Sequence, residues 1–364
     1  MALVSVPGPY AFAEALDAVE AGLSVMIFSD NVPVGQEVLL KRRAAERGVL
    51  VMGPDCGTAV IGGAGLGFAN VLRPGPVGVV AASGTGAQQA TCLLDLAGVG
   101  VSHVLGVGGR DLSAEVAGAS TLRALRALDA DPATELIFLI AKPPAPEVAR
   151  AVAEAVAKLD TPVVTALLGP DQDDLTTATE TVLRVLGIPV PEWPSWPAAG
   201  TAASPAGPAG APGAAAPAGR LRGIYSGGTL CTEARLVTGF GEFTDFGDDA
   251  YTRGRAHPMI DPTLRLEALA EVPPGDVALL DVVLGHGADP DPAARLAPAV
   301  AAATARGVTV VVALVGTEGD PQGLHAQALA LQAAGAAVFA SNARAAAYAA
   351  GAASAAAGTV ATAR

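Results

Sequence analysis

The feature that most constrains the fold of this chain is a repeated alternation of short apolar runs with glycine-rich breaks. Three breaks fall in the first third of the sequence: GPDCG at 53–57, SGTG at 83–86 and GVGGRD at 106–111. Glycine at the end of a strand lets backbone N–H groups approach a ligand closely, and a helix that follows adds its positive N-terminal end. Together the three breaks predict an anion site at the ends of strands.

Apolar strands alternate with helical text along the whole chain. We expect strands at 2–6, 24–28, 49–52, 77–82, 103–107, 135–141, 162–168, 222–226, 277–284, 309–315 and 337–340. Hydrophobic residues make up 51% of the chain and aromatic residues only 4%, so aliphatic side chains carry the apolar content, as in buried parallel strands covered by helices. The sequence predicts the α/β fold class, with three Rossmann-like or flavodoxin-like units and mostly parallel sheets.

Changes in composition mark the boundaries between these units. We expect a first, Rossmann-like domain at 1–73, a second, flavodoxin-like domain at 74–190 and a third, also flavodoxin-like, at 220–364. The intervening residues 191–219 are dominated by proline, alanine and glycine, and Glu192 is their only charged residue. Such a composition is typical of a linker.

Charge and length exclude several classes of partner. The formal net charge is −13, whereas proteins that bind phosphate backbones gather Lys and Arg into basic patches, so we expect no nucleic-acid partner. No apolar run approaches the roughly 20 residues that span a bilayer. An acidic surface disfavours anionic membranes, and the N-terminus lacks the pattern of a signal peptide. We therefore expect a cytoplasmic protein with no membrane partner.

The three cysteines are far apart and odd in number, which predicts neither a disulfide framework nor a zinc cluster. Cys56 lies in the first glycine-rich break. We interpret it as a small packing residue, with a nucleophilic role as the alternative. The cysteines therefore assign no metal ligands, and Mg²⁺ stays open as a cofactor.

Glycine-rich turns and one arginine are the leading candidates for binding an oxyanion. The SGTG turn opens a helix, so its N–H groups should point at a phosphate or carboxylate above the sheet, with packing alone as the alternative. Arg110 offers planar donors that suit bidentate binding, and the alternative is a surface salt bridge with Asp111 or Glu115. The predicted substrate or phosphate ligands are Asn70, Ser83, Gly84, Thr85, Gly86, Gly108, Gly109, Ser226, Gly227, Gly228 and Thr229.

The turn at 226–229 and Asn70 would reach the ligand of the SGTG turn only if the predicted units face each other. The strand, glycine turn and helix pattern recurs as SGGT at 226–229, and two such turns facing each other would form one cleft. Asn70 comes just before the second unit and is placed to contact the same ligand. A turn-stabilising amide is the alternative for Asn70.

His257 is the leading candidate for proton transfer. It lies in RGRAHP at 253–258 beside two arginines, whose charges lower the pKa of an imidazole and favour its neutral form. The alternative is a loop histidine that holds the turn at Pro258. Asp249 is a candidate to orient His257 or to ligate a metal, with a solvated acidic turn as its alternative. The predicted catalytic residues are His257, Arg110 and Arg255.

The first half of the chain resembles the alpha subunit of succinyl-CoA synthetase, in which GPNCPG, SRSGTLTYE and a GIGGDP-type turn stand at the places of the three breaks. LRGIYSGGTL at 221–230, RAHPMIDPT at 255–263 and LDVVLG at 280–285 look like the FdrA family of the same superfamily. The resemblance implies a succinyl-CoA synthetase-like fold and a link to oxamate carbamoyltransferase, a multisubunit enzyme of allantoin breakdown. It also implies other subunits and further copies of this chain as partners, and a small anionic substrate.

Two departures from the related alpha subunit bear on mechanism. The related CoA-binding domain begins with an extra strand and a glycine-rich phosphate turn, so residues 1–73 resemble a truncated CoA-binding domain and we expect no tight CoA binding. The histidine that carries phosphate in that subunit would fall near 169–174, which reads GPDQDD. His286, in GHGA at 285–288, resembles the carrier loop but follows a different strand, so we expect no phosphohistidine.

Without a carrier, the motifs favour a substrate that already contains an acyl-type phosphate. Our first interpretation is a transferase subunit that moves a carbamoyl group between phosphate and a small amide-acid, converting oxalurate and phosphate to oxamate and carbamoyl phosphate. Glycine-turn donors would hold the phosphate and the arginines the carboxylate. The alternative is a ligase like the NDP-forming acyl-CoA synthetases, acting on acyl phosphate or CoA. A further alternative is a non-catalytic organising subunit.

Overall fold

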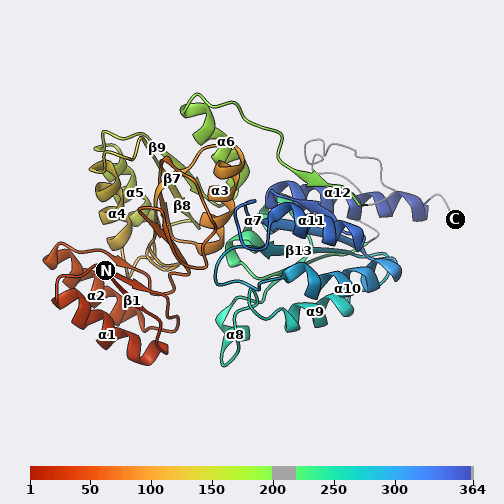
Figure 1. Cartoon of the computed structure of the whole chain (residues 1–364), viewed down its shortest axis with the longest axis horizontal. Helices are drawn as coiled ribbons and strands as arrows, with labels where there is room; N and C mark the ends of the chain where they lie inside the picture. The colour runs from red at the N-terminus through yellow and green to blue at the C-terminus, as the bar shows by residue number, and fades with distance from the viewer. Residues whose placement is uncertain (199–218, 362–364) are drawn as a thin grey trace. The chain divides into compact units, whose positions relative to one another are not determined.

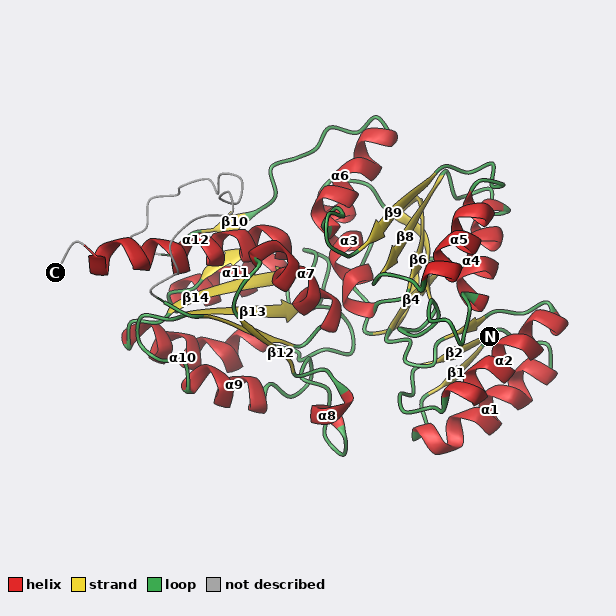
Figure 2. Cartoon of the chain, turned by 180° about the vertical axis from the view of Figure 1, so that it is seen from behind, coloured by secondary structure: helices red, strands yellow, loops and turns green. Residues whose placement is uncertain are grey.

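The computed structural model describes residues 1–198 and 219–361, with side chains as far as residue 354. The chain forms two compact units, and neither is one continuous stretch of sequence. Unit 1 comprises Met1–Asp173 and Thr177–Val190, and unit 2 comprises Asp174–Thr176 and Pro191–Arg364. Figure 1 and Figure 2 show the helices and strands of each unit. The division into three domains that composition suggests stays a prediction.

The first sheet of unit 1 consists of three short parallel strands, β1 Ala2–Val4, β2 Val25–Ile27 and β3 Val51–Met52, in that order. Helices α1 (Gly8–Glu20) and α2 (Val34–Arg47) connect them. In α1 the buried residues Ala11, Ala15 and Val19 recur every four positions, which gives the helix one apolar face. Gly48 caps the C-terminus of α2, and its φ of +75° is the left-handed conformation that glycine adopts without strain.

The second sheet of unit 1 has six strands in the order β5-β4-β7-β6-β8-β9. Four of them are parallel: β6 Pro74–Ala81, β7 Val101–Gly106, β8 Leu136–Ala141 and β9 Val163–Leu167. Figure 1 shows α3 (Gly84–Leu96) on one face of this sheet, and α4 (Ala119–Asp129) with α5 (Pro146–Val156) on the other. An antiparallel hairpin, β4 (Thr58–Ile61) and β5 (Ala64–Gly67), extends the edge next to β7.

One hydrophobic cluster joins the two sheets of unit 1, and the small sheet also packs a second cluster against α1 and α2. Met26 and Met52 of the small sheet join Leu105 and Ile137 of the large sheet and Leu125 of α4 in a single buried cluster. Burying a side chain of this size contributes roughly 1.5–3 kcal/mol relative to leaving it exposed. The shared core therefore fixes the strand ends from which the glycine-rich turns emerge.

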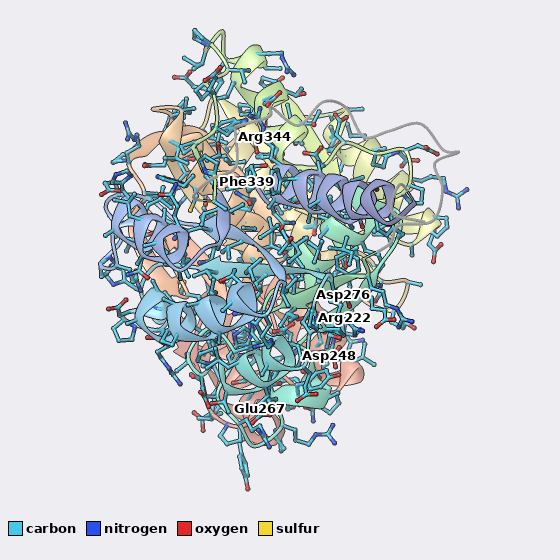
Figure 3. The ribbon with its side chains drawn as sticks, turned by 90° about the vertical axis from the view of Figure 1, so that its right-hand side faces the viewer. Arg222, Asp248, Glu267, Asp276, Phe339 and Arg344 are labelled. Carbon is cyan, nitrogen blue, oxygen red and sulfur yellow. The ribbon has the colours of Figure 1, made fainter. Side chains whose placement is uncertain are left out.

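Unit 2 is built on a six-stranded sheet in the order β10-β15-β14-β13-β11-β12. Its strands are β10 Ser195–Trp196, β11 Leu221–Tyr225, β12 Glu242–Asp245, β13 Val277–Val283, β14 Thr309–Val315 and β15 Ala337–Phe339, all parallel except β10. Figure 1 shows α7 (Gly228–Thr238) and α12 (Asn342–Ala361) on one face, and α9 (Thr263–Ala270) with α10 (Pro292–Ala305) on the other. Unit 2 also contains α8 (Asp249–Thr252) and α11 (Leu324–Ala333). On β11, Arg222 Nε lies 3.1 Å from Asp276 Oδ2 (Figure 3).

A buried carboxylate on α7 holds the beginning of α6 (Leu175–Val185) within unit 2. Glu233 Oε1 accepts from the Leu175 N–H (2.6 Å), and Oε2 accepts from Asn342 Nδ2 (2.7 Å). The Asn342 amide is fixed in turn, because its Oδ1 accepts from the Tyr225 hydroxyl at 3.0 Å. Both oxygens of Glu233 therefore face donors. Burial, together with the nearby Asp174 carboxylate, raises the pKa of Glu233 to about 7.

The predicted α/β fold class with mostly parallel sheets is confirmed. The first part of the expected linker forms an ordered edge instead, because Ser195–Trp196 pairs with β15 and Trp193 is buried. The remaining linker residues 199–218 lie outside the described residues. Within residues 1–198 and 219–361, no helix is long and apolar enough to cross a membrane.

Candidate functional site

The first and third glycine-rich breaks lie against each other in unit 1. A Cβ added to Gly108 would come within 2.4 Å of the Pro54 carbonyl oxygen, and one added to Gly106 within 2.5 Å of the Cys56 sulfur. Gly108 also has a φ of +90°, which other L residues rarely adopt. The close approach that these glycines permit is therefore between two turns of the protein itself.

Cys56 is enclosed by this contact between the turns. It is 2% exposed, and burial raises the pKa of its thiol to about 12. A thiol with so high a pKa carries almost no thiolate at neutral pH and is a poor nucleophile. These observations support the interpretation of Cys56 as a packing residue. Cys92 and Cys231 are likewise free and buried.

The second break forms the N-terminus of α3. Ser83 is the N-cap residue, and its Oγ accepts a hydrogen bond from the Gly86 N–H at 2.9 Å. The N–H groups of Gly84 and Thr85 belong to the first turn of the helix, where no helix carbonyl can accept from them. They remain as donors for an anion.

Thr58, which sequence reasoning missed, adds a hydroxyl to this helix end. It begins β4 directly after the first break and is 5% exposed. Its Oγ1 is buried without a hydrogen-bond partner among the described residues, and it would lie 3.3 Å from a Cβ on Gly84. An unsatisfied buried hydroxyl costs free energy, so native proteins usually satisfy it with a ligand or an ordered water. We call Thr58, Ser83, Gly84 and Thr85 the α3 site.

Two other predicted ligands have neighbours of their own. Asn70 is buried, and its Oδ1 accepts from Gln88 Nε2 of α3 at 3.0 Å. This contact matches the alternative interpretation of Asn70 as a structural amide. A Cβ on Gly109 would lie 3.6 Å from Asp55 Oδ2, so a carboxylate stands beside the third break. Whether Asn70 and Gly109 bind substrate stays a prediction.

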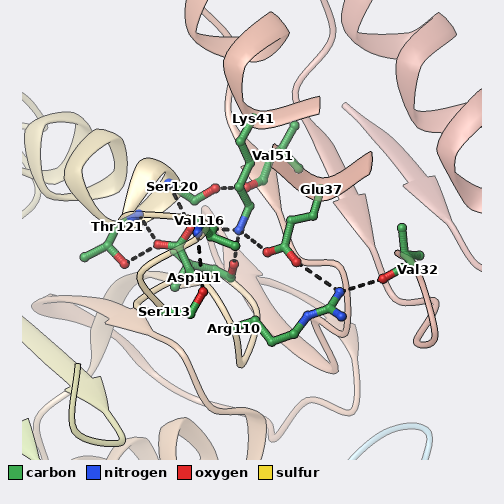
Figure 4. Close-up of polar contacts among 11 residues, drawn as sticks. Val32, Glu37, Lys41, Val51, Arg110, Asp111, Ser113, Val116, Ser120 and Thr121 are labelled. Carbon is green, nitrogen blue, oxygen red and sulfur yellow. Dashed lines mark hydrogen bonds and ion pairs between the residues drawn. The ribbon is translucent and has the colours of Figure 1, made fainter. Parts of the chain in front are cut away.

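Arg110 is anchored by a buried carboxylate on α2. Its Nη2 lies 3.0 Å from Glu37 Oε2 and donates to the Val32 carbonyl at 2.7 Å (Figure 4). The alternative interpretation placed a salt bridge with Asp111 or Glu115, and the structure shows Arg110 paired with Glu37. The Arg110 side chain is still 47% exposed. The contacts with Glu37 and Val32 hold the guanidinium in one orientation. The role of Arg110 as an oxyanion ligand stays a prediction.

Lys41 and Asp111 complete the charge network beneath Arg110. Lys41 Nζ lies 2.8 Å from Glu37 Oε1, 2.7 Å from Asp111 Oδ1 and 3.0 Å from the Val107 carbonyl oxygen (Figure 4). Asp111 Oδ2 accepts from the N–H and the hydroxyl of Thr121 at the start of α4. The side chains of Lys41, Glu37 and Asp111 are at most 1% exposed. The network therefore fixes the third break against α2 and α4.

The turn at 226–229 in unit 2 carries its own carboxylate. The N–H and the hydroxyl of Ser226 both donate to Asp281 Oδ1, at 2.7 and 3.0 Å. Arg265 Nη2 lies 2.9 Å from the same oxygen, and both charged side chains are buried. Burial raises the pKa of Asp281 against the opposing effects of Arg265 and Ser226, and burial lowers the pKa of Arg265. Gly228 and Thr229 begin α7, so their N–H groups lie at its positive end.

His257 lies beside this turn. Gly247 stands between them, because a Cβ on Gly247 would be 2.5 Å from the Ser226 carbonyl oxygen and 3.1 Å from His257 Nε2. His257 Nδ1 accepts from the Met259 N–H at 3.3 Å, which favours the tautomer with its proton on Nε2. Unit 2 thus brings together His257 and the turn at 226–229, which were both predicted as parts of the site. Arg255 is exposed in the loop after α8.

A small cavity borders the same turn. Ser226, Arg265 and Asp289 supply its polar lining, and Met259 and Leu296 are among its apolar residues. Its volume of about 10 Å³ suits one water molecule. Arg265 Nε is buried and has no hydrogen-bond partner in the part of the chain that the structure describes. The cavity is therefore a place for a water rather than for a substrate.

Two predictions about the site remain untested. In the described ranges, His, Cys, Asp and Glu side chains form no group of three or more that could hold a metal ion. Mg²⁺ as a cofactor stays a prediction. The α3 site belongs to unit 1 and the turn at 226–229 to unit 2, so a cleft shared by the two also stays a prediction.

Comparisons with known proteins match parts of both units. Residues 73–166 match the CoA binding domain family, and residues 224–352 match the CoA-ligase family. Over 383 aligned residues the chain is 37% identical to the uncharacterized protein YahF of Escherichia coli K12, an alignment that covers 94% of this chain and 74% of YahF.

A second relative and a solved structure come from CoA enzymes. Over 142 residues the chain is 31% identical to subunit alpha 2 of the ADP-forming succinate–CoA ligase of Archaeoglobus fulgidus, covering 38% of this chain and 48% of that subunit, about half its length. The dinucleotide-forming acetyl-coenzyme A synthetase 1 of Ca. Korarchaeum cryptofilum, solved with phosphate and ADP, is 17% identical at a TM-score of 0.38. That alignment covers 99% of this chain and 84% of the other.

These matches overturn the predicted reaction class. The family matched at 224–352 is a CoA-ligase family, and the matched alpha subunit belongs to a CoA ligase. The prediction of a carbamoyltransferase is therefore wrong. Glycine turns at helix N-termini bind phosphate in many reaction classes, so the motifs could not separate carbamoyl transfer from ligase chemistry. The succinyl-CoA synthetase-like part of the resemblance is confirmed.

Proposed function

The chain belongs to the protein family of Escherichia coli YahF, and from this membership and its two CoA-related domain matches we propose that it is a subunit of an acyl-CoA ligase-like enzyme. The proposed reaction transfers an acyl group between an acyl phosphate and CoA. The CoA sulfur bonds to the acyl carbon, the bond from that carbon to the phosphate oxygen breaks, and the thiol proton leaves with the phosphate. No phosphohistidine is needed, because the phosphate enters already bound to the acyl group.

The α3 site is the observation that carries this proposal. The buried, unpartnered hydroxyl of Thr58 lies beside Gly84, whose N–H opens α3 together with that of Thr85. Uncharged donors at the positive end of a 13-residue helix suit a phosphate that gains charge as its acyl bond breaks. Because these donors are already fixed by the fold, they need no reorganisation during the reaction. We assign the leaving phosphate to the α3 site.

Arg110 is the second proposed contact with substrate. Glu37 and the Val32 carbonyl hold its Nη2, and nearly half of its side chain is exposed. A guanidinium fixed in this way has less freedom to lose when it binds a carboxylate or phosphate. Arg110 and Gly84 both fall within residues 73–166, the part that matches the CoA binding domain family. This match supports CoA as the acyl acceptor, in place of the expectation of no tight CoA binding.

A partner subunit belongs to the same proposal. The Archaeoglobus fulgidus relative is named as an alpha subunit. Because that relative is one subunit of its ligase, we expect acyl transfer by this chain to require at least one other chain. Phosphate binding at the α3 site, in contrast, should be a property of this chain alone.

Titration calorimetry with inorganic phosphate and acetyl phosphate tests the α3 site on the purified chain. Thr58→Val removes the unpartnered hydroxyl and keeps the shape of the side chain. Thr91→Val is the matched control, because the buried Thr91 hydroxyl already donates to the Ala87 carbonyl within α3. A hydrogen bond to a charged group contributes about 1.5–3 kcal/mol, so Thr58→Val should weaken binding roughly 10- to 100-fold. Thr91→Val should bind like the wild type.

Equal phosphate affinity in the wild type and Thr58→Val would remove the α3 site from the proposal. Acyl transfer is measured separately, as loss of the free CoA thiol in the presence of acetyl phosphate and the products of neighbouring genes. If phosphate binds but no mixture forms acyl-CoA, the α3 site stands and the proposed reaction is wrong.

A further inference from the structure

The two strand–turn–helix motifs of this protein differ in a way that bears on anion binding. At the α3 site the helix end faces the neutral hydroxyl of Thr58, whereas in unit 2 the turn faces a carboxylate. Asp281 Oδ1 accepts from the Ser226 N–H, the Ser226 hydroxyl and Arg265 Nη2, at 2.7, 3.0 and 2.9 Å. The N–H and the hydroxyl of Ser226, the residue before the N-cap of α7, are therefore already paired inside the unit.

We infer that Asp281 is a built-in anion, which occupies the donors of Ser226 and places a negative charge at the turn of unit 2, so that an external oxyanion binds at the α3 site and not at this turn. The part that concerns the α3 site rests on the proposed function. The part that concerns Asp281 rests only on the contacts within unit 2. It revises the expectation that Ser226 binds phosphate, because its donors already have a partner of the charge that phosphate would bring.

A buried ion pair keeps Asp281 in this place. Asp281 is 0% exposed, and Arg265 is 3% exposed. Arg265 Nη2 also donates to the carbonyl oxygens of Ile224 and Asp281, so the guanidinium is tied to β11 and β13. Removing one partner of such a pair leaves an uncompensated charge in a buried site. The carboxylate therefore cannot rotate away to admit a ligand without leaving the buried Arg265 charge unpaired.

The charge balance around the turn points the same way. Asp245, at the end of β12, accepts from the Gly247 N–H at 2.9 Å, and its charge also acts on Arg265. Two carboxylates thus surround one guanidinium at these strand ends. An external phosphate would meet repulsion that is stronger here than in water, because the effective dielectric constant of a buried site is low.

Hydrogen exchange on the wild-type chain, with and without inorganic phosphate, tests where the anion binds. We expect phosphate to slow exchange of the amides at 83–90 and to leave those at 226–232 unchanged. Protection at 226–232 with Asp281 intact would overturn the inference. If phosphate protects neither segment, the α3 half of the inference and the proposed phosphate subsite fail together, and the Asp281 half is decided by the variant that follows.

Asp281→Ala tests whether this carboxylate is the built-in anion. The substitution keeps the donors of Ser226 and Arg265 and leaves a space that a small carboxylate can fill. We expect formate to raise the Tm of Asp281→Ala by roughly 3–6 °C at tenfold its Kd, and to leave the wild type and Asp281→Asn unchanged, because their side chains fill the space. If Asp281→Ala folds only with formate, the same dependence is read as soluble yield. A Tm or yield independent of formate overturns the inference.

Discussion

Replacing Lys41 with methionine removes the cation from the buried network under the third glycine-rich break. Methionine keeps the length and flexibility of lysine, so the change removes charge and hydrogen bonds more than packing. Lys41 Nζ lies within 3.0 Å of Glu37 Oε1, Asp111 Oδ1 and the Val107 carbonyl oxygen. Arg110 still pairs with Glu37 in the variant, but the Asp111 carboxylate loses its ion pair with Lys41 while remaining buried.

The size of the effect follows from burial. Removing one partner of a buried ion pair costs about 3–5 kcal/mol, and at roughly 2–4 °C of Tm per kcal/mol for a domain of this size, unit 1 should melt about 6–20 °C lower. Scanning calorimetry measures the shift, and hydrogen exchange should place the loss at 34–47 and 106–121. Arg42→Met, which changes an exposed cation next to Lys41, is the matched control and should stay within about 0.5 kcal/mol of the wild type.

Equal melting of Lys41→Met and Arg42→Met would refute the reasoning, because the network would then contribute nothing that an exposed charge does not. The double variant Lys41→Met with Asp111→Asn supplies a second measurement. If the stranded carboxylate is the main cost, removing its charge should recover part of the lost stability, so the two changes should not add. Additive losses would place the cost elsewhere in the network.

Two further changes have expected signs that the structure fixes. The pKa of Glu233 is raised from 4.5 to about 7, so the folded state holds this proton more tightly than the unfolded chain. Stability should therefore fall by up to about 3 kcal/mol as pH rises from about 4.5 through 7, and urea titrations should show a flatter profile for Glu233→Gln; identical profiles would contradict this. Gly108→Ala should destabilise unit 1 by about 1–3 kcal/mol more than Gly22→Ala, measured by calorimetry. Both glycines have positive φ, but only at Gly108 would a Cβ meet a carbonyl oxygen, that of Pro54 at 2.4 Å. Equal destabilisation by Gly108→Ala and Gly22→Ala would show that the contact between the two turns accommodates a Cβ at Gly108.

Strand positions could be predicted because buried parallel strands are continuous apolar runs that end in turn residues. β13 and β14 fall where the runs at 277–284 and 309–315 place them, within one residue. The hairpin β4–β5 was missed, although Gly62 and Gly63, with φ of +55° and +83°, are a two-residue hairpin signal. Its second strand, AGLG, contains a single large apolar residue and so lacks the pattern of a strand.

Charge partners could be predicted much less well. Glu37 and Lys41 are four residues apart on a helix, a spacing typical of exposed pairs, yet both are buried where α2 meets the third break. Asp281 carried a stronger signal, because an acidic residue inside the apolar run VALLDVV must be paired if the strand is buried. Its partner Arg265 lies on another element, and only the packing of α9 against β11 and β13 identifies it.

The glycine turn of the candidate site was predicted, and the Thr58 side chain was missed. The glycine turn at 83–86 and its helix could be predicted from the residue types alone, since Ser followed by Gly-Thr-Gly after a strand is a helix start. Thr58 was missed, because its hydroxyl reaches the helix end through the hairpin that the sequence pattern did not reveal. A polar residue directly after a glycine-rich break is the signal that would have found it.

The hydrogen bond from the Leu175 N–H to Glu233 bears on where the chain should be divided if the two units are to be expressed separately. Residues 174–176 belong to unit 2, although the helix that they begin continues into unit 1. A gene divided at residue 190, where composition suggests a border, would yield a C-terminal fragment in which Glu233 has lost the Leu175 N–H and Ser341 has lost the Thr176 hydroxyl. A fragment that starts at or before residue 174 keeps both partners, so the starting point for separate expression lies upstream of α6.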